Sequence, residues 1–189
     1  MEELDQIITL YINSLNSGIT DWIWMTFSNK FIWFPFYLIV LIFIIRRLGW
    51  KKGGIVALSL VLMVLATDQF ANLIKNSVCR YRPSHNVWML RSGLHLLEDA
   101  GSMFGFYSAH AANSFGFAVT SLMGFRNDKS RKYNGYAWCV FIWASMVAIS
   151  RVFAGKHFLG DVLVGIVAGL VFGYIFGFIA RKIITSLES

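Results

Sequence analysis

Residues 157–182 read HFLGDVLVGIVAGLVFGYIFGFIARK, and this stretch decides the class of fold. After Asp161 it has no charged residue until Arg181 and Lys182, and a helix that spans a bilayer needs about 20 such apolar residues. The segment from His157 to Ala180 is therefore predicted to cross a membrane. Glycines spaced four residues apart let two helix backbones approach closely. Here they are Gly165, Gly169, Gly173 and Gly177, hereafter the glycine stripe.

The composition of the whole chain supports the same class. Of its 189 residues 57% are hydrophobic and 14% are charged, and the mean hydropathy is +0.59. Soluble domains carry about 25% charged residues, so an ordinary soluble domain is excluded. The length fits a single domain, residues 1–189. Cys79 and Cys139 have no spacing that suggests a metal site or a disulfide.

Other apolar runs precede this segment. They cover Phe31–Ile45, Gly53–Lys75, Ser108–Phe125 and Gly135–Ser150. The chain is predicted to be all-α, a polytopic transmembrane helical bundle with about five to six spans. Glu2–Asn16 has apolar residues at helical spacing and a polar opposite face, which predicts an amphipathic helix on the membrane surface. Residues 1–30 are thus expected to form an interfacial N-terminal segment.

The basic residues predict which way the spans run. The net charge of +7 is compatible with nucleic acid or anionic lipid as a partner. In membrane proteins, however, lysine and arginine concentrate in cytoplasmic loops. We therefore expect the bilayer and a membrane lipid as partners, and no nucleic acid. If there are five spans, ten basic residues at span ends and in loops lie on the same side of the membrane, which is predicted to be the cytoplasmic side. They are Arg46, Arg47, Lys51, Lys52, Arg126, Lys129, Arg131, Lys132, Arg181 and Lys182.

Polar clusters interrupt the apolar pattern at the opposite ends of the same spans. They lie in residues 75–83, 107–110 and 150–161. Ionisable groups near a membrane core are costly, and their default interpretation is a functional site. A single one could equally be a side chain that reaches the interface. Because several fall on one predicted face, we expect a site there, open to the extracytoplasmic side of the membrane.

The residue types in these clusters suit a phosphate group. Lys75, Arg82 and Arg151 supply positive charge, and the guanidinium groups suit bidentate contacts to phosphate oxygens. Ser108 begins a predicted helix, whose free N–H groups attract an anion.

Two histidines are candidates for the chemical step. His157 and Asp161 are four residues apart, so the carboxylate can hold one ring nitrogen and leave the other as a nucleophile. His110 is suited to protonating a leaving oxygen. The competing interpretation is a metal site built from these two histidines and one aspartate. We expect no metal and no cofactor.

The same residues resemble a known family. Lys-x6-Arg-Pro at Lys75–Pro83, Ser-x-His at Ser108–His110 and Ser-Arg-x5-His-x3-Asp at Ser150–Asp161 are similar to the motifs of the type 2 phosphatidic acid phosphatase (PAP2) superfamily. The resemblance covers residues 53–180, the expected catalytic core. It implies a helical membrane bundle, hydrolysis without metal, and a phosphohistidine on His157 oriented by Asp161. It also implies His110 as general acid, with Lys75, Arg82, Ser108 and Arg151 binding phosphate.

One position departs from the family pattern. Ala109 stands where the family usually has a glycine whose backbone N–H contacts phosphate. Alanine keeps the N–H but disfavours positive φ. The change should be tolerated if residue 109 is helical, so Ala109 is included among the expected phosphate-binding residues.

The expected activity is hydrolysis of a lipid phosphate or diphosphate. Undecaprenyl (polyprenyl) diphosphate is the first expectation. The alternatives are a lipid A 1- or 4′-phosphatase and a phosphatidylglycerophosphate or phosphatidate phosphatase. A lipid phosphotransferase and a non-catalytic lipid-binding protein are alternatives from other classes. Glu98 and Asp99, adjacent in a polar loop, are interpreted as solvated charges.

Overall fold

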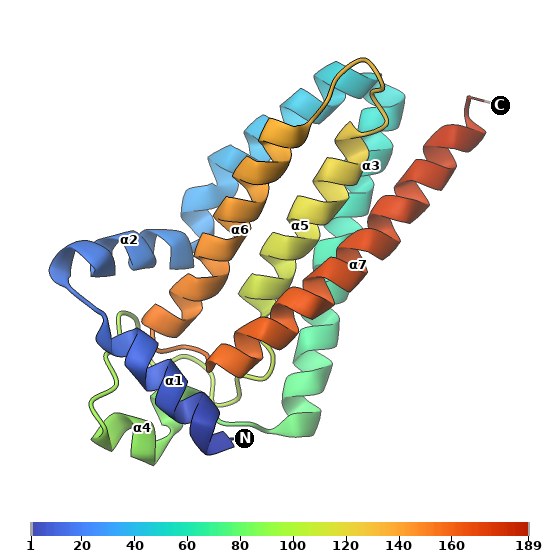
Figure 1. Ribbon diagram of the computed structural model, residues 1–189. Coiled ribbons are helices and arrows are strands. Elements are labelled where there is room, and N and C mark those ends of the chain that lie inside the picture. The colour runs from blue at the N-terminus through green and yellow to red at the C-terminus, as the bar shows by residue number, and fades with distance from the viewer. Residues whose placement is uncertain (1, 189) are drawn as a thin grey trace.

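The computed structural model describes residues 2–188, which are almost entirely helical (Figure 1). Its α-helices are α1 (Glu2–Ser14), α2 (Gly18–Ser28), α3 (Phe34–Val78), α4 (Val87–Arg91), α5 (Ala109–Phe125), α6 (Asn134–Phe153) and α7 (Leu159–Ser186). Short 3-10 turns cover Lys30–Trp33 (η1) and Pro83–His85 (η2). No strand occurs within residues 2–188, and Tyr81 and Phe104 form an isolated bridge. The all-α prediction is confirmed.

Helix α3 contains two of the predicted spans. Its path breaks at Gly49, where φ is +76°, a value that favours glycine. The chain folds back there (Figure 1), and a Cβ on Gly53 would lie 2.8 Å from the Cα of Ile45. Three helical segments, Lys30–Val78, α6 and α7, are long and apolar enough to cross a membrane. With α3 counted twice and α5 between the others, about five passes result, as predicted.

Helix α5 lies at the centre of the bundle, with α3, α6 and α7 around it (Figure 1). Its closest neighbour is α7, and the glycine stripe forms the contact. A Cβ on Gly165 would lie 2.5 Å from the carbonyl oxygen of Ser108, and one on Gly169 would lie 2.3 Å from that of Ala112. Because the glycines of the stripe have no side chains, α5 can pack directly against the α7 backbone, and this close contact fixes the register of the two helices.

The two ends of the bundle differ in character. The α3 turn, the loop between α5 and α6, and the C-terminal end of α7 lie at one end (Figure 1). These three segments carry the ten basic residues from which the topology was predicted. The beginnings of α5 and α7 and the ends of α3 and α6 lie at the other end. All three polar clusters are therefore at the end remote from the basic residues.

The N-terminal segment lies across this second end (Figure 1). Helix α1 is amphipathic as predicted, but its orientation is informative. Leu4, Ile7 and Tyr11 are exposed, whereas Thr9 and Asn13 are buried against the bundle. Its polar face therefore packs on protein and its apolar face is free for the membrane interface. Helix α2 runs crosswise and stacks Trp24 on Phe153 of α6, with ring centroids 4.3 Å apart.

Candidate active site

His157 and Asp161 meet at the start of α7. His157 lies in the turn before the helix rather than in the helix itself, and its side chain is only 3% exposed. Its Nδ1 is 3.5 Å from Oδ2 of Asp161, so the carboxylate faces the imidazole without a close hydrogen bond. The other ring nitrogen, Nε2, is on the opposite side of the ring, away from the carboxylate. This arrangement brings together two of the predicted residues.

Ser108 and Ala109 lie where α5 begins, directly beside this pair. The backbone N–H of Ser108 donates to the carbonyl of Asp161 at 3.0 Å, which ties the two helix starts together. The Ser108 side chain caps α5 by accepting from the N–H of Ala111. Ala109 is the first helical residue and does not have positive φ. The alanine in place of the family glycine is therefore accommodated without backbone strain.

The predicted cations Arg82, Arg151 and Lys75 lie near enough to His157 for their charges to act on it. Arg82 donates through Nε to the carbonyl of Phe104 at 3.2 Å and through Nη2 to Ser102. Burial lowers the pKa of His157 well below its ordinary value, and the charges of Arg151, Arg82 and Lys75 lower it further. The imidazole is thus held neutral, as a nucleophile must be.

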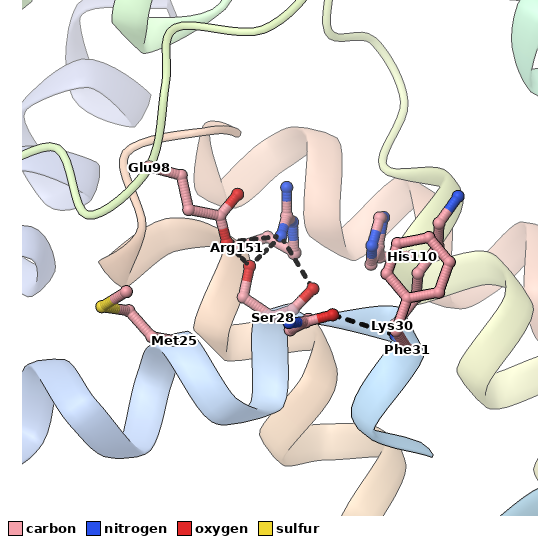
Figure 2. Close-up of a pocket in the computed structure, with 8 residues that line it drawn as sticks. Met25, Ser28, Lys30, Phe31, Glu98, His110 and Arg151 are labelled. Carbon is pink, nitrogen blue, oxygen red and sulfur yellow. Dashed lines mark hydrogen bonds and ion pairs between the residues drawn. The ribbon is translucent and has the colours of Figure 1, made fainter. Parts of the chain in front are cut away.

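His110 and Arg151 line one pocket of about 300 Å³ (Figure 2). Its other lining residues, from the α2–η1 junction and the loop before α5, are Met25, Ser28, Asn29, Lys30, Phe31 and Glu98. Arg151 is buried and donates from Nη1 to the carbonyl and hydroxyl oxygens of Ser28. His110 thus shares this pocket with Arg151, one of the phosphate-binding candidates.

The interpretation of Glu98 as a solvated charge is wrong, because its side chain is only 28% exposed. Asp99 is solvated as predicted, with a side chain that is 92% exposed, but it has a partner. Glu98 accepts a hydrogen bond from Ser28 and lies 3.6 Å from both Arg151 and Lys156. Lys156, only 4% exposed, also binds Asp99 at 2.9 Å, and this bond lowers the pKa of the Asp99 carboxyl group. The loop carboxylates therefore neutralise two buried cations, a role that needs distant partners and leaves no mark in the local sequence.

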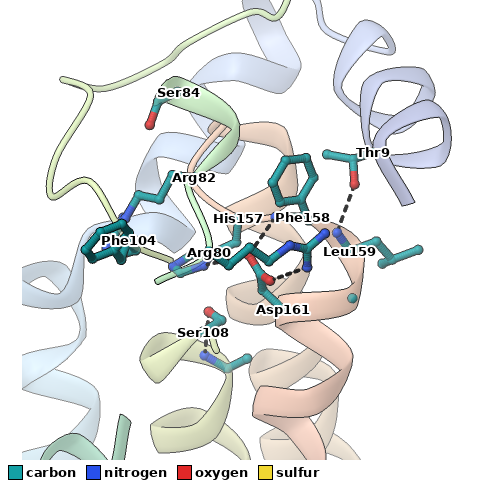
Figure 3. A network of polar contacts seen from close by, with 12 residues as sticks. Thr9, Arg80, Arg82, Ser84, Phe104, Ser108, His157, Phe158, Leu159 and Asp161 are labelled. Carbon is teal, nitrogen blue, oxygen red and sulfur yellow. Dashed lines mark hydrogen bonds and ion pairs between the residues drawn. The ribbon is translucent and has the colours of Figure 1, made fainter. Parts of the chain in front are cut away.

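Two further residues at the site were missed by the sequence interpretation. Arg80 donates from Nη1 to Oδ1 of Asp161 at 2.6 Å (Figure 3). Gly105 lies over the His157–Asp161 pair, and a Cβ there would lie 2.8 Å from Cγ of Arg82 and 3.5 Å from Nδ1 of His157. The sequence did offer a signal for Arg80, because it is a second arginine only two positions before the motif residue Arg82.

The residues between the helices contribute polar bridges rather than catalytic groups. Asn113 donates to Asp68 at 2.8 Å and accepts from Thr67, so it links α5 to α3. Asp68 therefore has a half-buried polar partner on α5. Within residues 2–188, no three or more histidine, cysteine or acidic side chains gather in a way that could hold a metal ion.

Fold and site together define a membrane-embedded phosphatase, with a neutral histidine, a buried carboxylate and a set of cations at one end of a helical bundle. The chain belongs to the PAP2 superfamily, whose sequence model matches residues 56–183.

Comparison with individual proteins agrees with this assignment. The chain is 29% identical to a lipid A 4′-phosphatase of Bacteroides thetaiotaomicron, over 100% of this chain and 82% of that protein. It is 27% identical to a lipid A 4′-phosphatase of Porphyromonas gingivalis, over 87% of this chain and 67% of that protein.

Two solved structures share the fold. The crystal structure of a transmembrane PAP2-type phosphatidylglycerolphosphate phosphatase from Bacillus subtilis matches with a TM-score of 0.75 and 20% identity, over 96% of this chain and 87% of that one. Aquifex aeolicus LpxE matches with a TM-score of 0.64 and 21% identity, over 89% and 92%.

Proposed function

We propose that this phosphatase removes a phosphate monoester from a phosphorylated glycolipid of the lipid A type, through a phosphohistidine on His157. The observation that carries the proposal is the buried imidazole of His157, whose Nδ1 lies 3.5 Å from the buried Asp161 carboxylate. Burial and the charges of Arg151, Arg82 and Lys75 lower the pKa of this imidazole. The names of the two curated relatives reported above support the substrate class.

The first step forms the phosphoenzyme. Arg82, Arg151 and Lys75 would hold the phosphate oxygens and offset charge in the transition state, with the N–H groups at the start of α5 adding donors. Nε2 of His157 attacks phosphorus as the bond from phosphorus to the lipid oxygen breaks. His110 gives its proton to that oxygen, which leaves as an alcohol.

The second step releases phosphate. Water attacks the phosphohistidine, and the nitrogen–phosphorus bond breaks. His110 takes the proton from the water, by microscopic reversibility. Inorganic phosphate departs and both histidines return to their starting states. Asp161 supports the charge that the imidazole carries while it holds the phosphoryl group.

The pocket beside His110 favours a sugar as leaving group. In an in-line displacement the leaving oxygen is opposite the nucleophile, on the side of the acid that protonates it. The pocket there combines Lys30, Asn29 and Glu98 with apolar Met25 and Phe31 (Figure 2). Such a lining suits hydroxyl and amide groups beside acyl chains, and the Glu98 carboxylate would repel a second phosphate.

Undecaprenyl diphosphate, the first expectation from the sequence, stays a prediction, because neither relative is named for it. We also propose that the site opens to the periplasmic or outer face of a bacterial inner membrane. Support comes from the basic residues, which cluster at the other end of the bundle (Figure 1).

The test is phosphate release by purified protein from a panel of lipids. It contains 4′-phosphorylated lipid A, 1-phosphorylated lipid A, undecaprenyl diphosphate, phosphatidylglycerophosphate and phosphatidate. We expect the highest kcat/KM with a lipid A phosphate and no turnover or trapped phosphoenzyme in His157→Ala, with an unchanged size-exclusion profile. Fastest release from undecaprenyl diphosphate would overturn the substrate proposal, and an active His157→Ala would overturn the nucleophile. Phosphate found on an acceptor lipid instead of in solution would identify a phosphotransferase.

A further inference from the structure

The carboxylate that faces the nucleophile is itself held by an arginine. Arg80 binds Oδ1 of Asp161 through Nη1 at 2.6 Å and Oδ2 of Asp5 through Nη2 at 2.7 Å. One guanidinium group thus bridges an acidic residue of α7 and one of α1. Its carbon also lies 4.3 Å from the centre of the Phe158 ring. Because the fork is planar and held on three sides, it fixes the orientation of the Asp161 carboxylate.

The position of Arg80 is set by the loop that carries it. The carbonyl of Arg80 accepts from the N–H of Gly105 at 2.9 Å, and Tyr81 forms the bridge with Phe104. Burial opposes the charge of Arg80, but the bonds to Asp5 and Asp161 outweigh it and raise the pKa of the guanidinium group. Arg80 therefore stays charged while it contacts both carboxylates.

Three successive turns of α1 form hydrogen bonds with the start of α7 and the end of α6. Asp5 accepts from the N–H of Gly160 at 2.9 Å, and Thr9 accepts from the N–H of Leu159 at 2.9 Å (Figure 3). These N–H groups belong to the first turn of α7, and Phe158 at the N-cap offers no side-chain acceptor. Helix α1 thus caps α7 from a distant part of the chain.

The third turn of α1 holds the other side of the His157 loop. Asn13 donates to the carbonyls of Phe153 at 2.9 Å and Val152 at 3.3 Å, at the end of α6. The segment between α6 and α7, which contains His157, is therefore anchored at both of its ends by one face of α1.

We propose that Asp5 and Arg80 are positioning residues, which act through Asp161 to hold His157 in its reactive orientation. Neither residue touches the phosphate site itself. Asp161 uses Oδ2 for the N–H of Phe158 at 3.1 Å, and the 3.5 Å separation from His157 leaves the imidazole sensitive to any rotation of the carboxylate. Loss of either bond to Arg80 would allow that rotation. This inference rests on His157 being the nucleophile.

The experiment compares Asp5→Asn, Arg80→Gln and the double variant, assayed with the best lipid of the panel above. We expect kcat to fall about tenfold in Asp5→Asn, and further in Arg80→Gln, while KM stays within about twofold, because supporting partners of a reactive side chain act on its orientation. Since Asp5 acts through Arg80, adding Asp5→Asn to Arg80→Gln should cause little further loss.

Glu3→Gln is the matched control. Glu3 lies on the same turn of α1, is exposed, and makes no contact at the site, so its variant should retain full kcat. Wild-type kcat in Asp5→Asn, or a loss that appears in KM alone, would overturn the inference. Losses that multiply in the double variant would also overturn it. Should Arg80→Gln fail to fold, Asp5→Asn alone decides. An inactive His157→Ala beside a normal Asp5→Asn refutes only this inference, whereas an active His157→Ala refutes the proposed function.

Discussion

Replacement of Gly165 by alanine should reach the active site through the helix contact alone. The added Cβ would lie 2.5 Å from the carbonyl oxygen of Ser108 and 3.1 Å from the Cβ of Ala111. A carbon and a carbonyl oxygen rest at about 3.3 Å or more, so the two backbones must separate by roughly 0.8 Å. Ser108 and His110 are on one side of this contact, and His157 and Asp161 are on the other.

A displacement of that size has a calculable cost. Misplacing a catalytic group by about 1 Å can lower the rate about 100-fold, so we expect kcat of Gly165→Ala to fall between tenfold and about 100-fold. Overpacking costs about 1–3 kcal/mol, and the gain in helix propensity returns up to about 1 kcal/mol. The net loss of stability should therefore be roughly 1–2 kcal/mol, seen as a lower Tm in detergent.

Two other glycines serve as controls, one in the glycine stripe and one on α3. Gly177→Ala meets only the flexible side chain of Met123, with Sδ at 2.7 Å, and should retain most activity. Gly54→Ala on α3 adds a Cβ with nothing within 4 Å and should be silent. The assay is phosphate release in the same micelles for all three variants, together with thermal unfolding. If Gly165→Ala keeps wild-type kcat and Tm, the close backbone contact does not set the site's geometry.

Other predictions address chemistry and sidedness. The lowered pKa of His157 means that its neutral, reactive form persists below the ordinary value of 6.5. The acid limb of the kcat/KM profile should therefore have its midpoint below pH 6.5. An acid limb with its midpoint above pH 6.5 would contradict a neutral nucleophile. Activity should survive exhaustive chelation and be inhibited by vanadate, whereas loss in EDTA restored by one metal would favour the metal-site alternative. In a Cys79→Ala, Cys139→Ala background, His85→Cys should react with an impermeant thiol reagent in intact cells and Asn127→Cys only after permeabilisation; the reverse pattern would invert the topology.

The sequence predicts the parts of this protein that depend on local pattern. The spans follow from runs of apolar residues, and the packing role of the glycine stripe follows from its spacing. The motif residues fall at helix ends, so the bundle brings Lys75, Ser108 and His157 to one end without further information. Ala109 is accommodated because it is helical, which was the condition set for it.

What the sequence does not reveal are contacts between distant segments. Asp5 looks like an exposed acidic residue of a surface helix, yet it binds Arg80, which lies 75 positions further along. Glu98 looks solvated, yet it faces buried Arg151. Such pairs depend on how loops cross the end of the bundle, and a single sequence carries no periodic signal for that crossing.

The central place of α5 has a consequence for how the protein is made. Most of its side chains are buried by other helices, and it carries the polar residues Asn113, Ser114 and Thr120. As an isolated helix it would therefore expose polar groups to lipid. The helix that covers its backbone, α7, follows it in the chain and is synthesised after it. We therefore expect α5 to settle stably in the bilayer only after α7 has emerged. Chains truncated before residue 159 should then be retained by the insertion machinery and degraded. Membrane integration and completion of the catalytic pair would be a single event in biogenesis.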